Sequence, residues 1–109
     1  MQETTAYLRE LNVDVPKVLL AYPAVFELPK RSLKARAAFL RRLGVDVPKV
    51  VHRFPQVFGI HQTKMREKVR CLRGMGLDVR RVVERRPTVL RYSAEALTQT
   101  FEYLRGLGV

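Results

Sequence analysis

The sequence predicts an all-α fold, a helical-repeat solenoid with units of 32 residues. Three observations support this prediction. A sequence motif recurs at a fixed spacing, an apolar stripe of helical period accompanies each copy, and each copy has a proline at the same position. The copies are LNVDVPKVLLAYPAVF at 11–26, LGVDVPKVVHRFPQVF at 43–58 and MGLDVRRVVERRPTVL at 75–90. Self-similarity at a period of about 20 to 50 residues is typical of stacked repeats. The pattern leaves the handedness of the solenoid undetermined.

The repeat divides the chain into three units and the start of a fourth. The units span residues 7–38, 39–70 and 71–102, and residues 103–109 open the fourth. The first two units are identical at twelve aligned positions. Units this small bury their apolar faces only when stacked, so we expect residues 1–109 to form a single array. Because the pattern has no polar capping unit, we interpret the chain as a fragment of a longer protein.

The first element of each unit is predicted to be a long amphipathic helix, which covers residues 62–75 in the middle of the chain. An apolar residue returns every three or four positions, as on one face of an α-helix. The stripes are Leu33, Ala37, Leu40 and Leu43; Met65, Val69, Leu72 and Met75; and Leu97, Phe101, Leu104 and Leu107. A residue that tolerates left-handed backbone stands at or just beyond the end of each helix: Asn12, Gly44, Gly76 and Gly108.

A short second helix is predicted after each glycine or asparagine. Its expected N-caps are Asp14, Asp46 and Asp78, because a carboxylate accepts hydrogen bonds from the free amides of the first turn. In the second unit its apolar face is Val50, Val51 and Phe54. Prolines end this helix in every unit: Pro23, Pro55 and Pro87. The five residues from each proline are expected to form a 3₁₀-like turn.

The composition indicates a globular protein that is attracted to polyanions. The chain is 47% hydrophobic and 28% charged, and it has no apolar run long enough to span a membrane. Its 21 Lys and Arg against 10 Asp and Glu give a net charge of +11. A positive balance of this size predicts an acidic partner, most often nucleic acid. The alternative interpretation is a surface whose charge serves only solubility.

The basic residues recur at equivalent positions, so stacking would align them in columns. The first column lies on the long helices and is Arg9, Arg41, Arg73 and Arg105, with Lys34 and Arg66 on the same flank. The second lies at the start of the short helices and is Lys17, Lys49 and Arg81. The third lies two residues before the proline and is Arg53 and Arg85.

These columns have two possible roles. Stacked helices lie about 10 Å apart, so long arginine side chains in a column can follow a phosphate backbone. Such contacts give affinity without base specificity and weaken with salt. The alternative is a solvated flank in which arginine stems cover apolar surface. The middle unit carries the largest net charge, +6, against +3 and +2 in its neighbours, so we expect contact to centre there.

No catalytic or metal-binding constellation is visible. The single cysteine, Cys71, excludes an internal disulfide and shares its column with large, mostly apolar residues, which indicates packing. His52 and His61 have no partner at metal-ligand spacing. The acidic side chains Glu84, Glu95 and Glu102 are expected on exposed faces beside arginines. We therefore expect neither an enzyme nor a cofactor nor a metal.

The repeated sequence motif resembles the repeat of the mitochondrial transcription termination factor (mTERF) family. The second copy matches the order Leu-Gly-Val, a short gap, then Val-Val-x-Arg-x-Pro-x-Val-Phe through Leu43–Phe58, and the third matches through Met75–Leu90. The first copy departs with Asn12 in place of glycine and Ala21 in place of arginine. The resemblance covers essentially the whole chain.

The resemblance implies a fold of two α-helices and a 3₁₀ turn per unit, stacked into a superhelix with a basic groove. It also implies action on nucleic acid in mitochondria or chloroplasts, in transcription termination or regulation, or in RNA processing, without enzymatic activity. Expected partners are double-stranded DNA or structured RNA, and proteins of organellar transcription or ribosome assembly; we expect a monomer away from membranes. The choice between DNA and RNA stays open. So does a different function, a scaffold whose basic rim binds an acidic protein.

Overall fold

The computed structural model describes residues 3–107, and this part of the chain is helical throughout, without a strand. Its elements follow one another in a repeating order of long helix, short helix and 3₁₀ turn, with the last long helix in two pieces. They are α1 (Glu3–Glu10), α2 (Val15–Ala21), η1 (Pro23–Glu27), α3 (Lys30–Arg42), α4 (Val47–Arg53), η2 (Pro55–Gly59), α5 (Gln62–Gly74), α6 (Val79–Arg85), η3 (Pro87–Arg91), α7 (Ala94–Gln99) and α8 (Phe101–Leu107). The predicted all-α repeat fold is confirmed.

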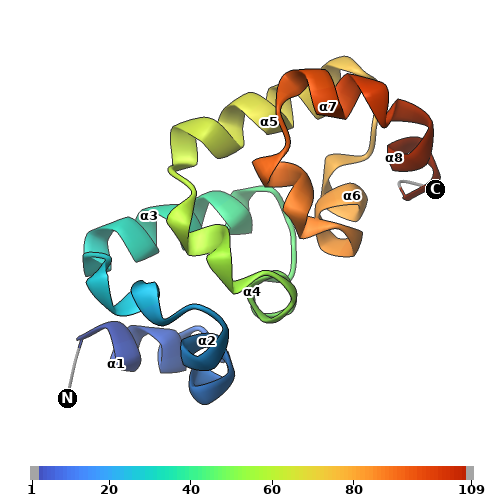
Figure 1. The fold of residues 1–109 in the computed structure, drawn as a ribbon. Helices are drawn as coiled ribbons and strands as arrows, with labels where there is room; N and C mark the ends of the chain where they lie inside the picture. Colours follow the sequence, from blue (N-terminus) through green and yellow to red (C-terminus); the bar gives the residue numbers. More distant parts are fainter. Residues whose placement is uncertain (1–2, 108–109) are drawn as a thin grey trace.

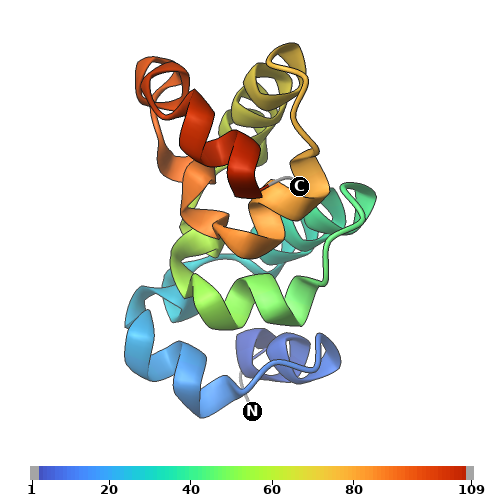
Figure 2. The ribbon, with the colours of Figure 1, turned by 90° about the vertical axis from the view of Figure 1, so that its right-hand side faces the viewer.

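The elements stack so that each one contacts its counterpart 32 residues further along the chain. Helix α1 packs against α3, α3 against α5 and α5 against α7, while α2, α4 and α6 pack in the same succession. The 3₁₀ turns η1, η2 and η3 also contact one another in order. Figures 1 and 2 show this progression from the N-terminal helices to the C-terminal ones, in a body of 45 × 22 × 22 Å.

The joint between long and short helix is made by the predicted residues. The side chains of Asp14, Asp46 and Asp78 each accept a hydrogen bond from the backbone N–H three residues later, at 3.1 to 3.2 Å. The backbone is left-handed at Asn12 (φ 63°), Gly44 (φ 81°) and Gly76 (φ 76°), as predicted. These left-handed residues end the long helices and turn the chain sharply toward the aspartate caps. Gly108 lies outside the described residues.

Each short helix ends where its proline begins a 3₁₀ turn. Phe54, predicted within the short helix, instead follows it with φ −148° and ψ 75°, because proline disfavours helical backbone at the preceding residue. Its ring is nevertheless buried. In η2, Val57 and Phe58 are fully buried, whereas the equivalent Phe26 of η1 is 39% exposed. In the described structure η2 packs on α3 of its own unit and also on α2 and η1 of the preceding unit, whereas η1 packs on α1 and α2.

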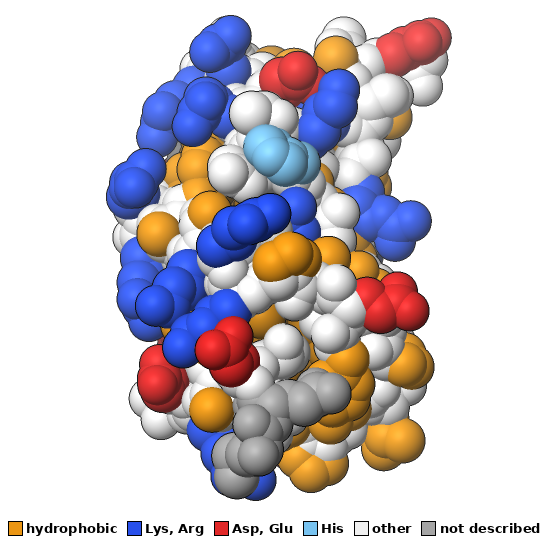
Figure 3. Space-filling model, turned by 90° about the vertical axis from the view of Figure 1, so that its left-hand side faces the viewer, with side chains coloured by type: hydrophobic (Ala, Val, Ile, Leu, Met, Phe, Trp, Pro, Cys, Tyr) orange, Lys and Arg blue, Asp and Glu red, His pale blue; other side chains and the backbone are white. Residues whose placement is uncertain are grey.

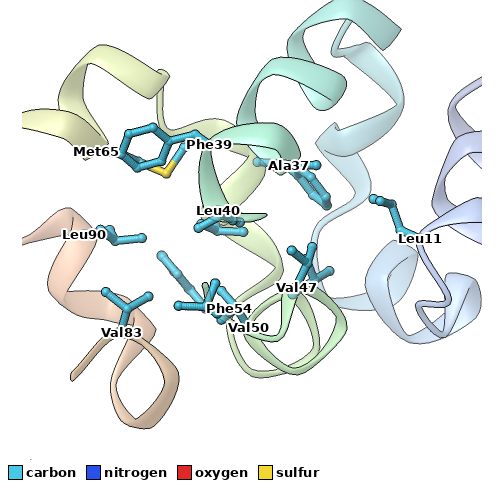
Figure 4. Close-up of a cluster of buried hydrophobic side chains, with 14 of the residues drawn as sticks. Leu11, Ala37, Phe39, Leu40, Val47, Val50, Phe54, Met65, Val83 and Leu90 are labelled. Carbon is cyan, nitrogen blue, oxygen red and sulfur yellow. The ribbon is translucent and has the colours of Figure 1, made fainter. Parts of the chain in front are cut away.

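The apolar stripes of the long helices meet the short helices in one continuous core. Leu33, Ala37 and Leu40 of α3 and Met65 and Leu72 of α5 are fully buried. Figure 4 shows side chains from α3, α4, α5, α6 and η3 pointing toward one another across several units. Because the core crosses every unit boundary, the joints that position the basic side chains are held by their neighbours.

The last long helix differs from the prediction. The stripe that includes Leu97 and Leu104 predicts one helix, but the chain forms α7 and α8 with a break at Thr100 (φ −103°, ψ 17°). The hydroxyl of Thr100 donates to the carbonyl of Ala96 at 2.8 Å and lies 3.3 Å from that of Leu97. A hydroxyl that bonds back to the preceding turn competes with the backbone and bends helices.

Candidate nucleic-acid interface

Two of the predicted basic columns lie on the same edge of the stack. The first column occupies the last turns of the long helices, and the second occupies the first turns of the short helices that follow. Only the tight turn of each joint separates the two, and Figure 2 shows these connecting turns one above another. The repeated joint therefore gives a basic edge that runs the length of the stack.

The long-helix column is exposed at every position. Arg9, Arg41, Arg73 and Arg105 each stand in the last turn of their helix, where a cation interacts favourably with the helix dipole. Arg105 forms an ion pair with Glu102 at 2.8 Å, while Arg41 and Arg73 have no carboxylate within ion-pair distance among the described residues. Helix stability accounts for part of this column, and Arg41 and Arg73 are available to a ligand.

The short-helix column cannot be explained by helix stability. Lys17, Lys49 and Arg81 are exposed and sit in the first turn of α2, α4 and α6, where positive charge opposes the helix dipole. A capping box would place glutamate or glutamine at this position. Arg81 is compensated by Asp78 at 3.6 Å, but Lys17 and Lys49 have no such partner in the described structure. A basic residue therefore recurs in the first turn of all three short helices, where the helix dipole does not favour it.

The third column is used inside the stack. Arg53 donates from Nη1 to the backbone carbonyl of Glu84 at 2.8 Å, and Arg85 donates from Nη1 to the carbonyl of Leu107 at 2.6 Å. Both guanidinium groups are exposed but tie one unit to the next. Their first role is to fix the stacking, so they are less available to a ligand than the arginines of the long helices.

His52 and Glu84, for which the sequence predicted no structural role, accept hydrogen bonds from a neighbouring unit. The N–H of Asp46 donates to the carboxylate of Glu84 at 2.8 Å, and the N–H of Asp14 donates to Nε2 of His52 at 2.7 Å. Only 16% of the Glu84 side chain is exposed, so its placement on an exposed face was wrong. The equivalent short-helix residues His52 and Glu84 thus fasten the first two joints to the unit that follows each of them. The equivalent Leu20 of the first unit is 86% exposed.

A cavity of about 380 Å³ opens between α3 and α5. Apolar side chains and four arginines line it: Phe39, Arg42, Leu43, Arg66, Val69, Arg70 and Arg73. We call this cavity the α3–α5 pocket. It gathers Arg66 and Arg73, which the columns predicted, with Arg42 and Arg70, which they did not. Arg66, Arg70 and Arg73 share one helical face by spacing, but only the packing of α3 on α5 brings Arg42 to them.

Figure 3 shows the distribution of charge on the face where the long helices begin. Lys and Arg side chains run down one edge of this face (left in the view), and acidic side chains lie beside them toward the N-terminal end and near the top of the view. The predicted Lys34 is exposed on α3, away from the pocket lining. All eleven predicted basic residues are exposed, although only some are brought together.

Other basic groups have structural roles. Arg36 is 8% exposed and donates from Nη1 to the carbonyl of Phe58, and burial lowers the pKa of its guanidinium. Arg86 lies 5.7 Å from the centre of the Tyr103 ring, and a hydrogen bond with Tyr92 raises the pKa of Arg86. Arg91 lies 5.6 Å from the ring centre of Phe54. These contacts hold the stack together from its sides.

The remaining candidate groups do not assemble a reactive site in the described part of the chain. Cys71 is half-buried against the core, as expected, but Tyr103 of the same column is 50% exposed. Burial raises the pKa of the Tyr7 hydroxyl, with Arg41 acting in the opposite direction. Within residues 3–107 no three His, Cys, Asp or Glu side chains are grouped to hold a metal ion, and no helix is long and apolar enough to cross a membrane.

Comparison with known proteins assigns the chain to a family. The sequence model of the mTERF family matches residues 1–108. No curated protein and no solved structure matched the chain. The family match covers every unit, the joints and both basic columns, and it agrees with the helical-repeat fold. The chain belongs to the mTERF family, whose members are organellar nucleic-acid-binding repeat proteins.

Proposed function

We propose that this chain is a nucleic-acid-binding array that holds the phosphate backbone on the basic edge of its stack. The observation that carries the proposal is the repeated lysine or arginine in the first turn of each short helix, where it opposes the helix dipole. Evolution of a stable fold alone would favour the reverse charge there. The family supports the same partner.

The proposed contact residues are those of the columns and their flank. They are Arg9, Lys17, Lys34, Arg41, Lys49, Arg53, Arg66, Arg73, Arg81, Arg85 and Arg105. Arg53 and Arg85 would contribute through their remaining donors, since each already bonds to a neighbouring carbonyl. The three units, with residues 103–109, would act as one array, because the long-helix column Arg9, Arg41, Arg73 and Arg105 has a member in each of them.

The family match also supports a proposal for the cellular role. We propose that the chain works as a monomer in a mitochondrion or chloroplast, in transcription termination or regulation or in RNA processing. Phosphate contacts set position along a strand and carry no base information, so sequence preference would come from other contacts. Double-stranded DNA and structured RNA are both compatible with the basic edge.

The test is a binding measurement on the full chain. Fluorescence anisotropy with a labelled DNA duplex and a labelled RNA hairpin is expected to give binding that weakens steeply with salt, because each phosphate contact releases counterions. Poly-glutamate serves as the matched polyanion. Binding to either nucleic acid in preference to poly-glutamate supports the proposal. Equal or tighter binding to poly-glutamate, or no binding to nucleic acid at low salt, would overturn it.

A further inference from the structure

The α3–α5 pocket is not a repeating feature of the stack. The position of Arg42 is held by Glu10 one unit earlier and by Gly74 one unit later. The position of Arg70 is held by Ala38 and by Glu102. The neighbouring grooves, α1 with α3 and α5 with α7 and α8, therefore lack the two extra arginines and gain an acidic residue each. The concentration of charge belongs to one junction alone.

The four arginines that line the pocket have no local charge compensation in the described structure. No carboxylate lies within ion-pair distance of Arg42, Arg66, Arg70 or Arg73 among the described residues. Like charges that line one cavity repel one another, which disfavours the compact state. An anion in the cavity removes that repulsion and gains the attraction of all four groups.

The floor of the pocket strengthens such binding. Phe39 and Val69 are almost fully buried, and Leu43 is half-buried beside them. An apolar floor excludes water on one side, and charge-assisted hydrogen bonds are stronger where the local dielectric is lower. Basic side chains on a fully solvated helix surface make their contacts in water, where salt screens them.

We propose that the α3–α5 pocket is the main anchoring site for nucleic acid and holds two consecutive phosphates of one strand. Two phosphates match four guanidinium groups, since an arginine pair can bind each phosphate with parallel N–H donors. The inference rests on the proposed function, because it names where on the array the backbone is held. It adds Arg42 and Arg70 as binding residues and gives the middle junction the greatest part of the affinity.

Two double variants with equal loss of charge test the anchor. Arg42→Gln with Arg70→Gln removes two pocket arginines outside the columns, and Lys34→Gln with Arg41→Gln removes two column residues outside the pocket. We expect Arg42→Gln with Arg70→Gln to weaken binding of the labelled duplex at least about tenfold more than Lys34→Gln with Arg41→Gln. The slope of log K against log salt concentration is expected to become shallower by about two. Equal losses in the two variants would overturn the anchor while leaving nucleic-acid binding intact. No binding by the unmodified chain would instead defeat the proposed function itself.

Stability separates a binding role from a packing role. Because the pocket arginines repel one another, Arg42→Gln with Arg70→Gln is expected to keep or raise the thermal midpoint of the free protein. A clear fall in the midpoint together with unchanged binding would show that these arginines serve packing. Should that variant not fold, Arg42→Lys with Arg70→Lys keeps both charges, and we expect an intermediate loss of affinity because bidentate geometry is removed.

A direct measurement uses the unmodified protein. The thymidine dinucleotide pTpT carries two consecutive phosphates, and its titration into isotope-labelled protein can be followed through the arginine Nε–Hε resonances. We expect the resonances of Arg42, Arg66, Arg70 and Arg73 to shift more than that of Arg41. Larger shifts at Arg41 than in the pocket would overturn the proposal.

Discussion

At the scale of the residue, burial decides what each apolar side chain contributes. Leu72 on α5 is fully buried, and Leu20 on α2 is 86% exposed, although both are leucines on helices of the same stack. Replacing each of these leucines with alanine changes helix propensity by the same amount, so a difference in the free energy of unfolding between the two variants measures the contribution of packing.

We predict that Leu72→Ala lowers the free energy of unfolding by about 2–5 kcal/mol, because it leaves a cavity in the core. Leu20→Ala serves as the matched control and is expected to change stability by less than about 0.5 kcal/mol. Urea denaturation followed by circular dichroism measures both. A similar loss in the two variants would contradict the burial of the long-helix stripe.

Two glycines in the same joint have opposite roles. Gly76 has φ 76°, which an L-residue adopts only with strain, whereas Gly74 ends α5 and a Cβ added there meets nothing within 4 Å. Gly76→Ala is expected to destabilise the protein by about 1–2 kcal/mol. Gly74→Ala is expected to leave stability unchanged or raise it by up to about 1 kcal/mol, because alanine is the better helix former. Thermal melts of the two variants, side by side, check the difference in sign.

At the scale of the element, the short helix depends on its own cap and on the next unit. The carboxylate of Asp46 accepts a bond from the N–H of Lys49, while the N–H of Asp46 donates to the carboxylate of Glu84. One residue thus begins α4 and connects it to α6. This arrangement explains why a cap recurs in every unit although each short helix has only seven residues.

We predict that Asp46→Ala destabilises the protein by about 0.5–2 kcal/mol through loss of the N-cap. Glu84→Leu, which introduces the residue found at the equivalent Leu20, is expected to cost about 1 kcal/mol because the Asp46 N–H loses its acceptor. Glu84→Gln keeps an acceptor oxygen and is the control. If Glu84→Leu and Glu84→Gln prove equally stable in urea denaturation, the bond between α4 and α6 contributes nothing.

At the scale of the whole molecule, the net charge of +11 acts against the fold that carries it. Repulsion among exposed cations disfavours the compact state, and salt screens it. We therefore predict that the thermal midpoint rises as sodium chloride increases from about 20 mM to about 300 mM, over which the Debye length falls from roughly 20 Å to below 10 Å. Differential scanning calorimetry measures the change. A midpoint that falls with salt would mean that attractive ion pairs outweigh the repulsion.

The same charges that destabilise the free chain are those expected to bind nucleic acid. Arg42→Gln with Arg70→Gln is expected to show a smaller rise of the midpoint with salt than the unmodified protein. The free protein therefore carries an electrostatic cost that a polyanion removes, which is typical of the compromise between stability and function.

Local rules were sufficient to predict the repeat and its joints. Each joint depends on contacts between residues only a few positions apart in the chain. These contacts involve the aspartate caps, the left-handed Gly44 and Gly76, and the prolines that end the short helices, and they recur with the 32-residue period. Such contacts are set by backbone sterics and by short side chains that reach their own turn. They can therefore be recognised in the sequence without knowledge of the stack.

Tertiary structure decided the bonds that Arg53 and Glu84 make between units, and the meeting of Arg42 with Arg70. The sequence by itself determined the all-α helical-repeat class, the excess of positive charge and its recurrence at equivalent positions. Which of those charges gather around one cavity depends on how α3 packs against α5, because residues far apart in the chain meet only through the core between them. The 32-residue period determines which helices, caps and basic residues recur, and the packing of α3 on α5 determines where a feature forms that does not recur, the α3–α5 pocket.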